Sequence, residues 1–176
     1  MKRSGFRKKT LDEVITKQAI KKAKTGQILR HRASKKVKKT PVKQLKTKLW
    51  ELCKQIVRLQ HINKDGTWNC YTCGKLIDEP AKAQTGHFLA SSVCGAYLRY
   101  DLRNLRIQDY YCNINLGGNG ATYYKNIVER EGQEYVNQIF KDKNIIIKAD
   151  EFWYKAKIAE YEILLQELRE SNSSNI

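Results

Sequence analysis

The sequence predicts an α+β protein in which a small cysteine-bearing finger lies between helical segments. Two stretches, 45–59 and 149–169, place apolar residues at the spacing of one helix face. The stretch 67–112 divides instead into short segments separated by turn-forming residues, which is typical of short strands. Cysteines stand near both ends of that middle stretch, as a zinc-stapled finger requires.

The first predicted helix has the clearest pattern in the chain. Its apolar side chains recur every three or four residues, at Leu45, Leu49, Leu52, Ile56 and Leu59. Cys53 falls on the same face, one turn after Leu49, and is expected to pack there as a buried thiol. Asp65 and Gly66 then predict a turn.

The remaining elements follow from shorter patterns. Strands are predicted at four places, namely 68–71, 86–90, 98–100 and 105–107. A helical run is predicted from Thr122 to about Lys141, with Gly132 dividing it in two. A short β-branched stretch at 144–148 precedes the last helix, which is predicted to reach about Arg169.

The excess positive charge is confined to the N-terminal part of the chain. The net charge is +16, and residues 1–48 account for all of it, with 18 basic and two acidic residues. We therefore divide the chain into a basic arm, 1–44, and a domain, 45–176. The arm includes four closely spaced lysines, Lys35, Lys36, Lys38 and Lys39. Such an arm favours a polyanion through counterion release, although a solvated tail has the same composition.

Composition also excludes some classes of protein. No apolar run approaches the about 18 residues that a membrane span needs, so no membrane partner is expected. The basic N-terminus is not followed by the apolar core of a secretory signal, which favours a cytoplasmic location. The five cysteines then favour thiol–metal chemistry over a disulfide framework.

The cysteine spacing predicts a structural zinc site. Cys70 and Cys73 are separated by two residues and followed by Gly74, as in a zinc knuckle. Cys112 would belong to the second half of the site, where the position three residues earlier is Asp109. A carboxylate can bind zinc, so one hypothesis is a site of three cysteines and Asp109. Two other residues could supply the fourth ligand, Cys94 or His61.

A second group of residues between these half-sites suggests phosphodiester chemistry. Hydrolysis needs a base that activates water and a divalent ion that stabilises the charge on the phosphate. His87 suits the base role, and Asn104 could fix its tautomer. Asn113 and Asn119 are oxygen donors that could join His87 in holding Mg²⁺. The alternative is that His87 is a structural histidine beside Phe88.

Arginines and tyrosines near these residues allow two interpretations. Arg99 and Arg103 could bind phosphate groups of a nucleic acid, or they could form surface salt bridges with nearby acids. Four tyrosines could stack on bases or belong to the core, namely Tyr110, Tyr111, Tyr123 and Tyr124.

These residues together resemble the NinG/Rap recombination proteins of lambdoid phages, a branch of the HNH, or ββα-metal, nucleases. The resemblance covers roughly 45–170 and depends on several short motifs in a fixed order. They are Cys70-Tyr-Thr-Cys73-Gly74, Gln84-Thr-Gly-His87-Phe88, Leu98-Arg99-Tyr100-Asp101, Arg103-Asn104-Leu105 and Cys112-Asn113-Ile-Asn-Leu-Gly-Gly118-Asn119.

The resemblance implies a zinc-stapled ββα finger that cleaves branched DNA, such as Holliday junctions or D-loops, with Mg²⁺ or Mn²⁺. His87, Asn104 and Asn113 would stand at the first, middle and third HNH positions, and Gln84 or Asp101 could complete the metal ligands. Two departures are Asp109, where the family pattern has a zinc-binding cysteine, and Asn113, where many relatives have histidine. Relatives that act on two strands suggest a homodimer, and a phage or prophage origin would place the protein in the bacterial host cytoplasm.

Two other classes of function share some of these features. A non-catalytic zinc-finger DNA-binding protein that assists recombination would also have the arm and the cysteines, but would not need His87, Asn104 and Asn113 in register. An RNA-binding, ribosome-associated protein would have the same charge and would prefer RNA.

Overall fold

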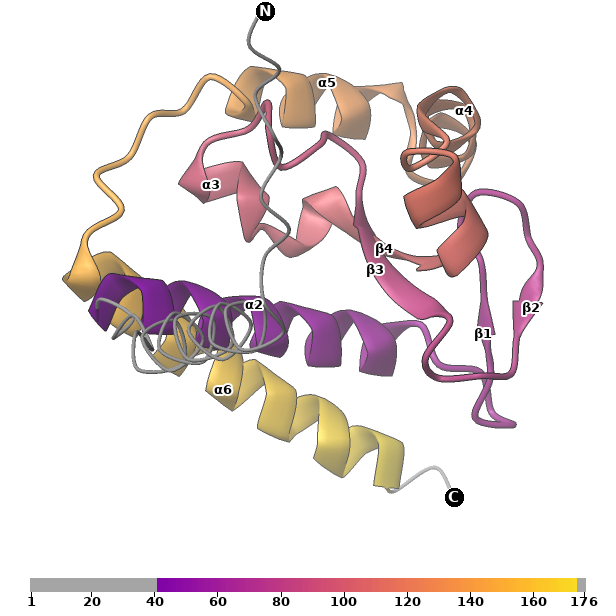
Figure 1. The fold of residues 1–176 in the computed structure, drawn as a ribbon, viewed down its shortest axis with the longest axis horizontal. Helices are drawn as coiled ribbons and strands as arrows, with labels where there is room; N and C mark the ends of the chain where they lie inside the picture. The colour runs from indigo at the N-terminus through magenta and orange to yellow at the C-terminus, as the bar shows by residue number, and fades with distance from the viewer. Residues whose placement is uncertain (1–40, 174–176) are drawn as a thin grey trace, which may run out of the picture. The chain divides into compact units, whose positions relative to one another are not determined.

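The computed structural model describes residues 41–173, in which helices combine with two small antiparallel sheets in an α+β arrangement (Figure 1). The elements in chain order are α2 (Pro41–Gln60), β1 (Trp68–Asn69), β2 (Leu76–Ile77), β3 (Ala83–His87), α3 (Ala96–Arg99), the 3₁₀ turn η1 (Leu102–Asn104), β4 (Leu105–Asp109), the π-helical turn η2 (Tyr111–Asn115), α4 (Gly120–Glu131), α5 (Gln133–Asp142) and α6 (Glu151–Ser173). The predicted basic arm, with Lys35, Lys36, Lys38 and Lys39, lies outside the described residues.

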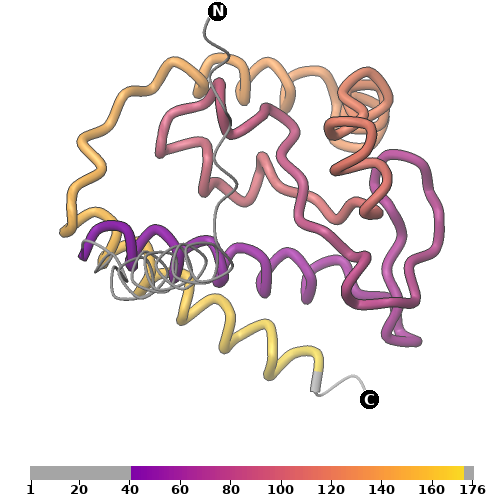
Figure 2. Tube along the Cα trace, viewed as in Figure 1, coloured from indigo at the N-terminus to yellow at the C-terminus, as the bar shows by residue number. Residues whose placement is uncertain are grey.

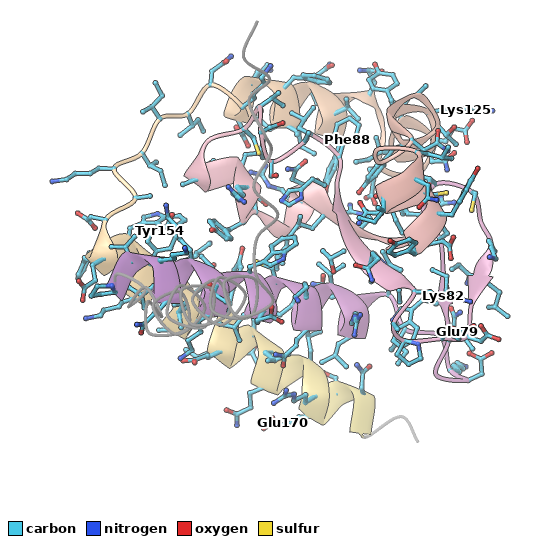
Figure 3. The ribbon with its side chains drawn as sticks, in the orientation of Figure 1. Glu79, Lys82, Phe88, Lys125, Tyr154 and Glu170 are labelled. Carbon is cyan, nitrogen blue, oxygen red and sulfur yellow. The ribbon has the colours of Figure 1, made fainter. Side chains whose placement is uncertain are left out.

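Helices α2 and α6 run side by side and in the same direction (Figures 1 and 2). Near their starts, Lys46 Nζ lies 5.8 Å from the centre of the Tyr154 ring, which Figure 3 places beside α2. Near their ends, Asn172 Nδ2 donates to the Leu59 carbonyl at 3.4 Å. The apolar face of α2 is thereby buried, and Cys53 is fully buried on it, as predicted.

The two hairpins organise the middle of the chain. Strands β1 and β2 pair over two residues, whereas β3 and β4 pair over five, from Ala83 opposite Asp109 to His87 opposite Leu105. Because side chains alternate along β4, Leu105 and Ile107 pack into the core formed with α2 and α6. Arg106 points to the other face, toward α4 and α5.

A second core joins α4 and α5 to the β1–β2 turn and to α3. Its buried side chains are Tyr71, Leu98, Tyr123, Ile127, Val136 and Ile139. Phe88, labelled in Figure 3, packs at its edge, with its ring centre 5.4 Å from that of Tyr123 and 6.0 Å from that of Phe140. The segment that follows His87 is therefore fixed to these helices by aromatic contacts.

Arg106 is a buried charge that the fold satisfies with several partners. Its Nη2 donates to Glu131 Oε1 and to the Tyr135 hydroxyl, both at 2.9 Å, and its Nη1 donates to the Leu105 carbonyl at 2.8 Å. A buried guanidinium costs much less when it is paired and hydrogen-bonded. The network therefore links β4 to both α4 and α5.

The structure confirms most of the predicted elements and changes some of the predicted strands. The helices at 45–59 and 149–169 form, and Gly132 divides the run 122–141 as expected. The segment 98–100 was predicted as a strand, but it forms the end of helix α3 and the residue after it, because Leu98 is buried against α4 and α5. The strand predicted at 86–90 begins and ends three residues earlier, at Ala83–His87, and the strand predicted at 68–71 is confined to Trp68–Asn69.

Within residues 41–173, none of the helices combines the length and the apolar character that crossing a membrane would require.

Gly132 offers a test of the helix break. Its φ of +91° is a conformation that a side chain disfavours, so Gly132→Ala should lower the free energy of unfolding by about 1 kcal/mol or more. Gly120 at the start of α4 has no positive φ and open space around it, so Gly120→Ala should leave stability unchanged or raise it. Urea unfolding measures both, and equal effects would contradict the assigned backbone conformation.

Candidate metal and phosphodiester site

Three of the predicted zinc ligands come together. Cys70 and Cys73 lie in the turn between β1 and β2, and Cys112 lies in η2; their sulfur atoms are all within 4.8 Å of one another. The turn closes through a hydrogen bond from Gly74 N to the Cys70 carbonyl at 2.9 Å, and Gly74 adopts a φ of +74°. Three thiols at this separation could hold a metal ion, and thiolates are ligands that zinc prefers.

The thiols differ in their electrostatic surroundings. Burial raises the pKa of Cys70, but backbone N–H groups of Cys73, Asp109 and Thr72 and the Thr72 hydroxyl point at its sulfur, and they leave the pKa below its usual value. Burial raises the pKa of Cys73 to about 11, together with its two neighbouring thiols. Cys70 is thus the thiol whose ionised form the fold supports.

The Asp109 carboxylate does not join the three sulfur atoms, as a site of three cysteines and Asp109 would require. Its Oδ2 accepts a hydrogen bond from Tyr111 N at 3.1 Å, and its Oδ1 lies 3.9 Å from Lys75 Nζ. The carboxylate therefore caps the first turn of η2, while the backbone N–H of Asp109 points at Cys70.

The other two candidates for a fourth ligand also lie elsewhere. Cys94 Sγ points to the Leu89 carbonyl at 3.8 Å. His61 lines a pocket with Arg106 and Glu131, and burial lowers the pKa of its imidazole to about 4. Among the described residues, the group of close metal-ligating atoms consists of the three cysteines.

His87 is held in a defined orientation at the end of β3. Its ring stacks on Trp50 of α2, with ring centres 5.0 Å apart and an angle of 8° between the planes. Its Nε2 is 3.0 Å from the Arg99 carbonyl oxygen. Because a carbonyl can only accept, Nε2 must bear the proton, which leaves the Nδ1 lone pair free to accept one in the neutral ring.

The pocket around His87 has basic and neutral walls. Its volume is about 490 Å³, and it is lined by Lys43, Lys46, Thr47, Trp50, Thr85, His87, Ser91, Arg99, Tyr100 and Asn113. No Asp or Glu is among the described residues that line it. Burial lowers the pKa of His87, and the nearby Arg99 charge lowers it further, against the opposing effect of the Arg99 carbonyl. The imidazole is therefore neutral at pH 7.

Asn104 is fully buried and acts on the backbone. Its Oδ1 accepts from Leu89 N at 2.7 Å, and its Nδ2 donates to the carbonyls of Leu89 and Leu98 at 3.1 and 3.2 Å. The prediction that Asn104 contacts His87 and fixes its tautomer is wrong. The His87 ring is held by the carbonyl of Arg99 instead. Asn104 supports His87 indirectly, by bonding the carbonyl of Leu98, the residue before Arg99 in α3.

Of the other residues predicted to bind the catalytic metal ion, one lines the pocket and the others lie outside its lining. Asn113 lines the pocket with His87. Asn119 lies at the start of α4 with a φ of +49°, and its carbonyl accepts from Tyr123 N at 2.9 Å; it is not among the lining residues. Gln84 donates to the Ala81 carbonyl at 2.6 Å, away from these lining groups.

The two candidate arginines have different surroundings. Arg99 lines the pocket, so a phosphate contact stays a prediction for it. Arg103 forms ion pairs with Asp101 and Asp142, both at 2.6 Å, and their hydrogen bonds raise the pKa of its guanidinium. These pairs support the structural interpretation of Arg103, and they also occupy Asp101.

Helix α2 contributes residues to the pocket that were not among the predicted site residues. Lys43, Lys46 and Trp50 have the i, i+3, i+7 spacing of one helix face, and this signal was present in the sequence. Lys43 was assigned to the basic arm, which hid the pattern. Of the four tyrosines, Tyr123 lies in the core, whereas Tyr110, Tyr111 and Tyr124 are exposed, against the core alternative.

Comparison with known proteins gives a family. The family model described as "Bacteriophage Lambda NinG protein" matches residues 2–171. The chain belongs to the NinG family. "Protein ninG" of Escherichia phage lambda is 33% identical over 110 residues, which are 62% of this chain and 52% of that protein. "Protein ninG" of Salmonella phage P22 is 33% identical over 111 residues, again 62% and 52%.

A third NinG relative, from Escherichia phage 933W, is 32% identical over 110 residues, 62% of this chain and 53% of that protein. The matched part of the chain thus spans about half the length of these curated NinG relatives. No solved structure is significantly similar to the chain.

Metal analysis tests the cysteine cluster of this NinG-family chain. We expect about one zinc per purified chain, lost in Cys70→Ser and in Cys112→Ser, because each removes one of three converging thiols. Asp109→Asn keeps an acceptor for Tyr111 N but removes the carboxylate, so it should retain the zinc. Loss of zinc from Asp109→Asn would show that the carboxylate binds the metal after all.

Proposed function

We propose that this protein is a metal-dependent DNA endonuclease of the HNH type that cleaves branched recombination intermediates. The observation that supports this most is the state of His87, whose Nε2–H is held by a backbone carbonyl at the edge of a basic pocket. A stacked, neutral imidazole with a free Nδ1 is the arrangement that a general base needs.

The environment of His87 supports a role as the base. Water bound next to Nδ1 would lose its proton to the ring as it attacks a phosphorus atom. The Nε2–H to carbonyl bond orients the ring and stabilises the imidazolium that forms, as an orienting acceptor does in other general-base sites. Its lowered pKa keeps the ring unprotonated at neutral pH before the reaction begins.

The charge of the pocket suits a phosphate group. Lys43, Lys46 and Arg99 contribute three cationic side chains, and the described lining has no carboxylate to repel an anion. Cationic groups around a phosphodiester attract it in the ground state and stabilise the added negative charge of the pentacovalent transition state. The exposed Tyr110 and Tyr111, in and beside the turn that includes Asn113, offer rings on which bases could stack.

The residues present fit a catalytic divalent ion only in part. Asn113 offers the type of oxygen that Mg²⁺ accepts. The only lone pair of His87, on Nδ1, is taken by the base role, so the predicted His87 ligand does not fit beside it, and no carboxylate is among the described residues that line the pocket. The phosphate oxygens of the substrate would have to supply the negative charge in the ligand set. When bound, such an ion would neutralise charge on the phosphate and the leaving oxygen.

The three-thiol cluster lies outside the pocket but is connected to it through the chain. Cys112 and Asn113 are consecutive residues of η2, so a zinc ion on Cys112 would hold the turn that presents Asn113 to the pocket. In this proposal zinc is structural, and the chemistry belongs to His87 and Asn113. A non-catalytic DNA-binding accessory protein would need the cluster and the cations but not the orientation of His87.

Cleavage of a synthetic four-way DNA junction tests the proposal. Wild-type protein should cut it with Mg²⁺ or Mn²⁺ and not with EDTA, and His87→Ala should lower the rate by about 100-fold or more. The rate of wild-type protein should rise with pH through a midpoint below 6.5, because the base must be neutral and its pKa is lowered. Gel cleavage assays between pH 5 and 8 measure both.

Two controls keep the His87 result interpretable. His61→Ala removes another histidine with a lowered pKa, outside the pocket, and should leave cleavage and its pH midpoint unchanged. His87→Ala should still bind the junction and retain zinc. Cleavage that persists in His87→Ala, or wild-type protein that binds without cutting, would favour the accessory protein, and a preference for RNA without cleavage would favour the third class.

The lysines of α2 provide a test of phosphate binding. Lys43→Gln/Lys46→Gln should weaken junction binding. The plot of log affinity against log salt concentration should become less steep, with a slope smaller in magnitude by about 2, one for each lost phosphate contact. The matched control, Lys48→Gln/Lys54→Gln, removes the same charge from lysines that pair with Glu162 and Glu51. Fluorescence anisotropy in EDTA at several salt concentrations compares them, and equal slopes for the two double variants would contradict the assignment.

A further inference from the structure

Gln108 is a buried polar side chain to which sequence analysis assigned no role. It lies on β4, is fully buried, and donates from Nε2 to the Gly118 carbonyl at 2.8 Å. Its Oε1 is also buried and has no hydrogen-bond partner among the described residues. A buried amide oxygen without a hydrogen-bond donor costs free energy, so we expect a neighbouring group that can donate to it.

The unpartnered oxygen lies over Gly86, next to Asn113. A Cβ on Gly86 would lie 1.8 Å from Gln108 Oε1 and 3.1 Å from Asn113 Oδ1, so both amide oxygens border the space that the glycine leaves open. Gly86 directly precedes His87 on β3, and Asn113 lines the pocket with His87. The missing side chain at position 86 therefore lets two amide groups meet beside the proposed base.

The two ends of an Asn amide have nearly the same shape, but one donates and the other accepts. A half-turn of the Asn113 amide puts its Nδ2–H group where Oδ1 stands, facing Gln108 Oε1. We propose that Gln108 is a positioning residue, which accepts from Asn113 Nδ2 and so directs Asn113 Oδ1 into the His87 pocket. The inference rests on the proposed nuclease function, because it assigns Asn113 Oδ1 to the phosphate or its metal ion.

The same side chain also fixes the turn behind Asn113. Gln108 Nε2 bonds the Gly118 carbonyl, and Gly118 N donates to the Cys112 carbonyl at 2.9 Å. Both ends of the Gln108 amide would thus act on η2 and the residues that follow it. Groups that orient a ligand in this way typically change activity or metal affinity about 10- to 100-fold when they are lost.

Gln108→Met tests the proposal, because methionine is similar in size and forms neither hydrogen bond. We expect its kcat to fall about 10-fold or more, as in Asn113→Ala, with the pH midpoint set by His87 unchanged. The double variant Gln108→Met/Asn113→Ala should be no slower than Asn113→Ala alone, because Gln108 acts through Asn113. Multiplied losses in the double variant would overturn the proposal and show a general structural role.

Gln108→Glu and Gln138→Met serve as companions. Burial favours the protonated carboxyl at 108, which keeps an acceptor for Asn113 Nδ2 and an O–H for the Gly118 carbonyl, so Gln108→Glu should retain more activity than Gln108→Met. Gln138 lies on α5 and bonds Asp142 at 2.7 Å, away from the pocket lining, so Gln138→Met should match the wild type. Equal losses in Gln108→Glu and Gln108→Met would contradict an acceptor role for Gln108.

A measurement that needs no activity separates this proposal from the nuclease function. In ¹⁵N NMR spectra, the side-chain amide protons of Asn113, identified by their absence in Asn113→Ala, should exchange slowly with water in wild-type protein. In Gln108→Met they should shift and exchange faster. If the NMR spectra show this change but the protein does not cut DNA, the contact between Gln108 and Asn113 is supported and the nuclease function is rejected. Asn113 signals unchanged by Gln108→Met would overturn the contact.

Discussion

The candidate site depends on one buried amide, the side chain of Asn104. Three hydrogen bonds join it to the backbone of Leu89, at the start of the loop after β3, and of Leu98 in α3. Each such bond contributes about 1 kcal/mol net, and its loss inside the protein costs more. Arg99 follows Leu98 directly, and its carbonyl holds the His87 ring. These hydrogen bonds therefore help to position the carbonyl that holds the His87 ring.

The alternation of side chains along β4 explains why the pocket forms where it does. Leu105 and Ile107 enter the core with α2, whereas Arg106 enters the other side and binds Glu131 and Tyr135. Burial lowers the pKa of Arg106, but these partners outweigh it and keep the guanidinium charged. A slip of one residue in the β3–β4 register would exchange the two faces and bury the arginine against α2. The charge thus helps to fix the register that places His87, opposite Leu105, beside Trp50.

How much could be predicted depended on whether the signal was local. The helix at 45–59 and the break at Gly132 follow from spacing and from one residue type, and both formed. The segment 98–100 was misassigned because three residues show no period, and its conformation is set by burial against distant helices. Lys43 and Lys46 were missed because their role depends on β3 and η2, which are far away in the sequence. The approach of the three cysteines was predictable, since their spacing implies a shared ligand.

The turn η2 connects the two halves of the site. Its five residues have π-helical spacing, a local geometry that is uncommon and frequently found at functional sites. One result is that Cys112 faces two other sulfur atoms while Asn113, the next residue, lines the pocket with His87. A metal ion on the sulfur atoms would restrain the backbone on one side of Asn113, and Gln108 restrains the turn on the other through Gly118. The geometry of the pocket is then set by groups outside it, so that changes at the cysteines would reach Asn113 without touching His87.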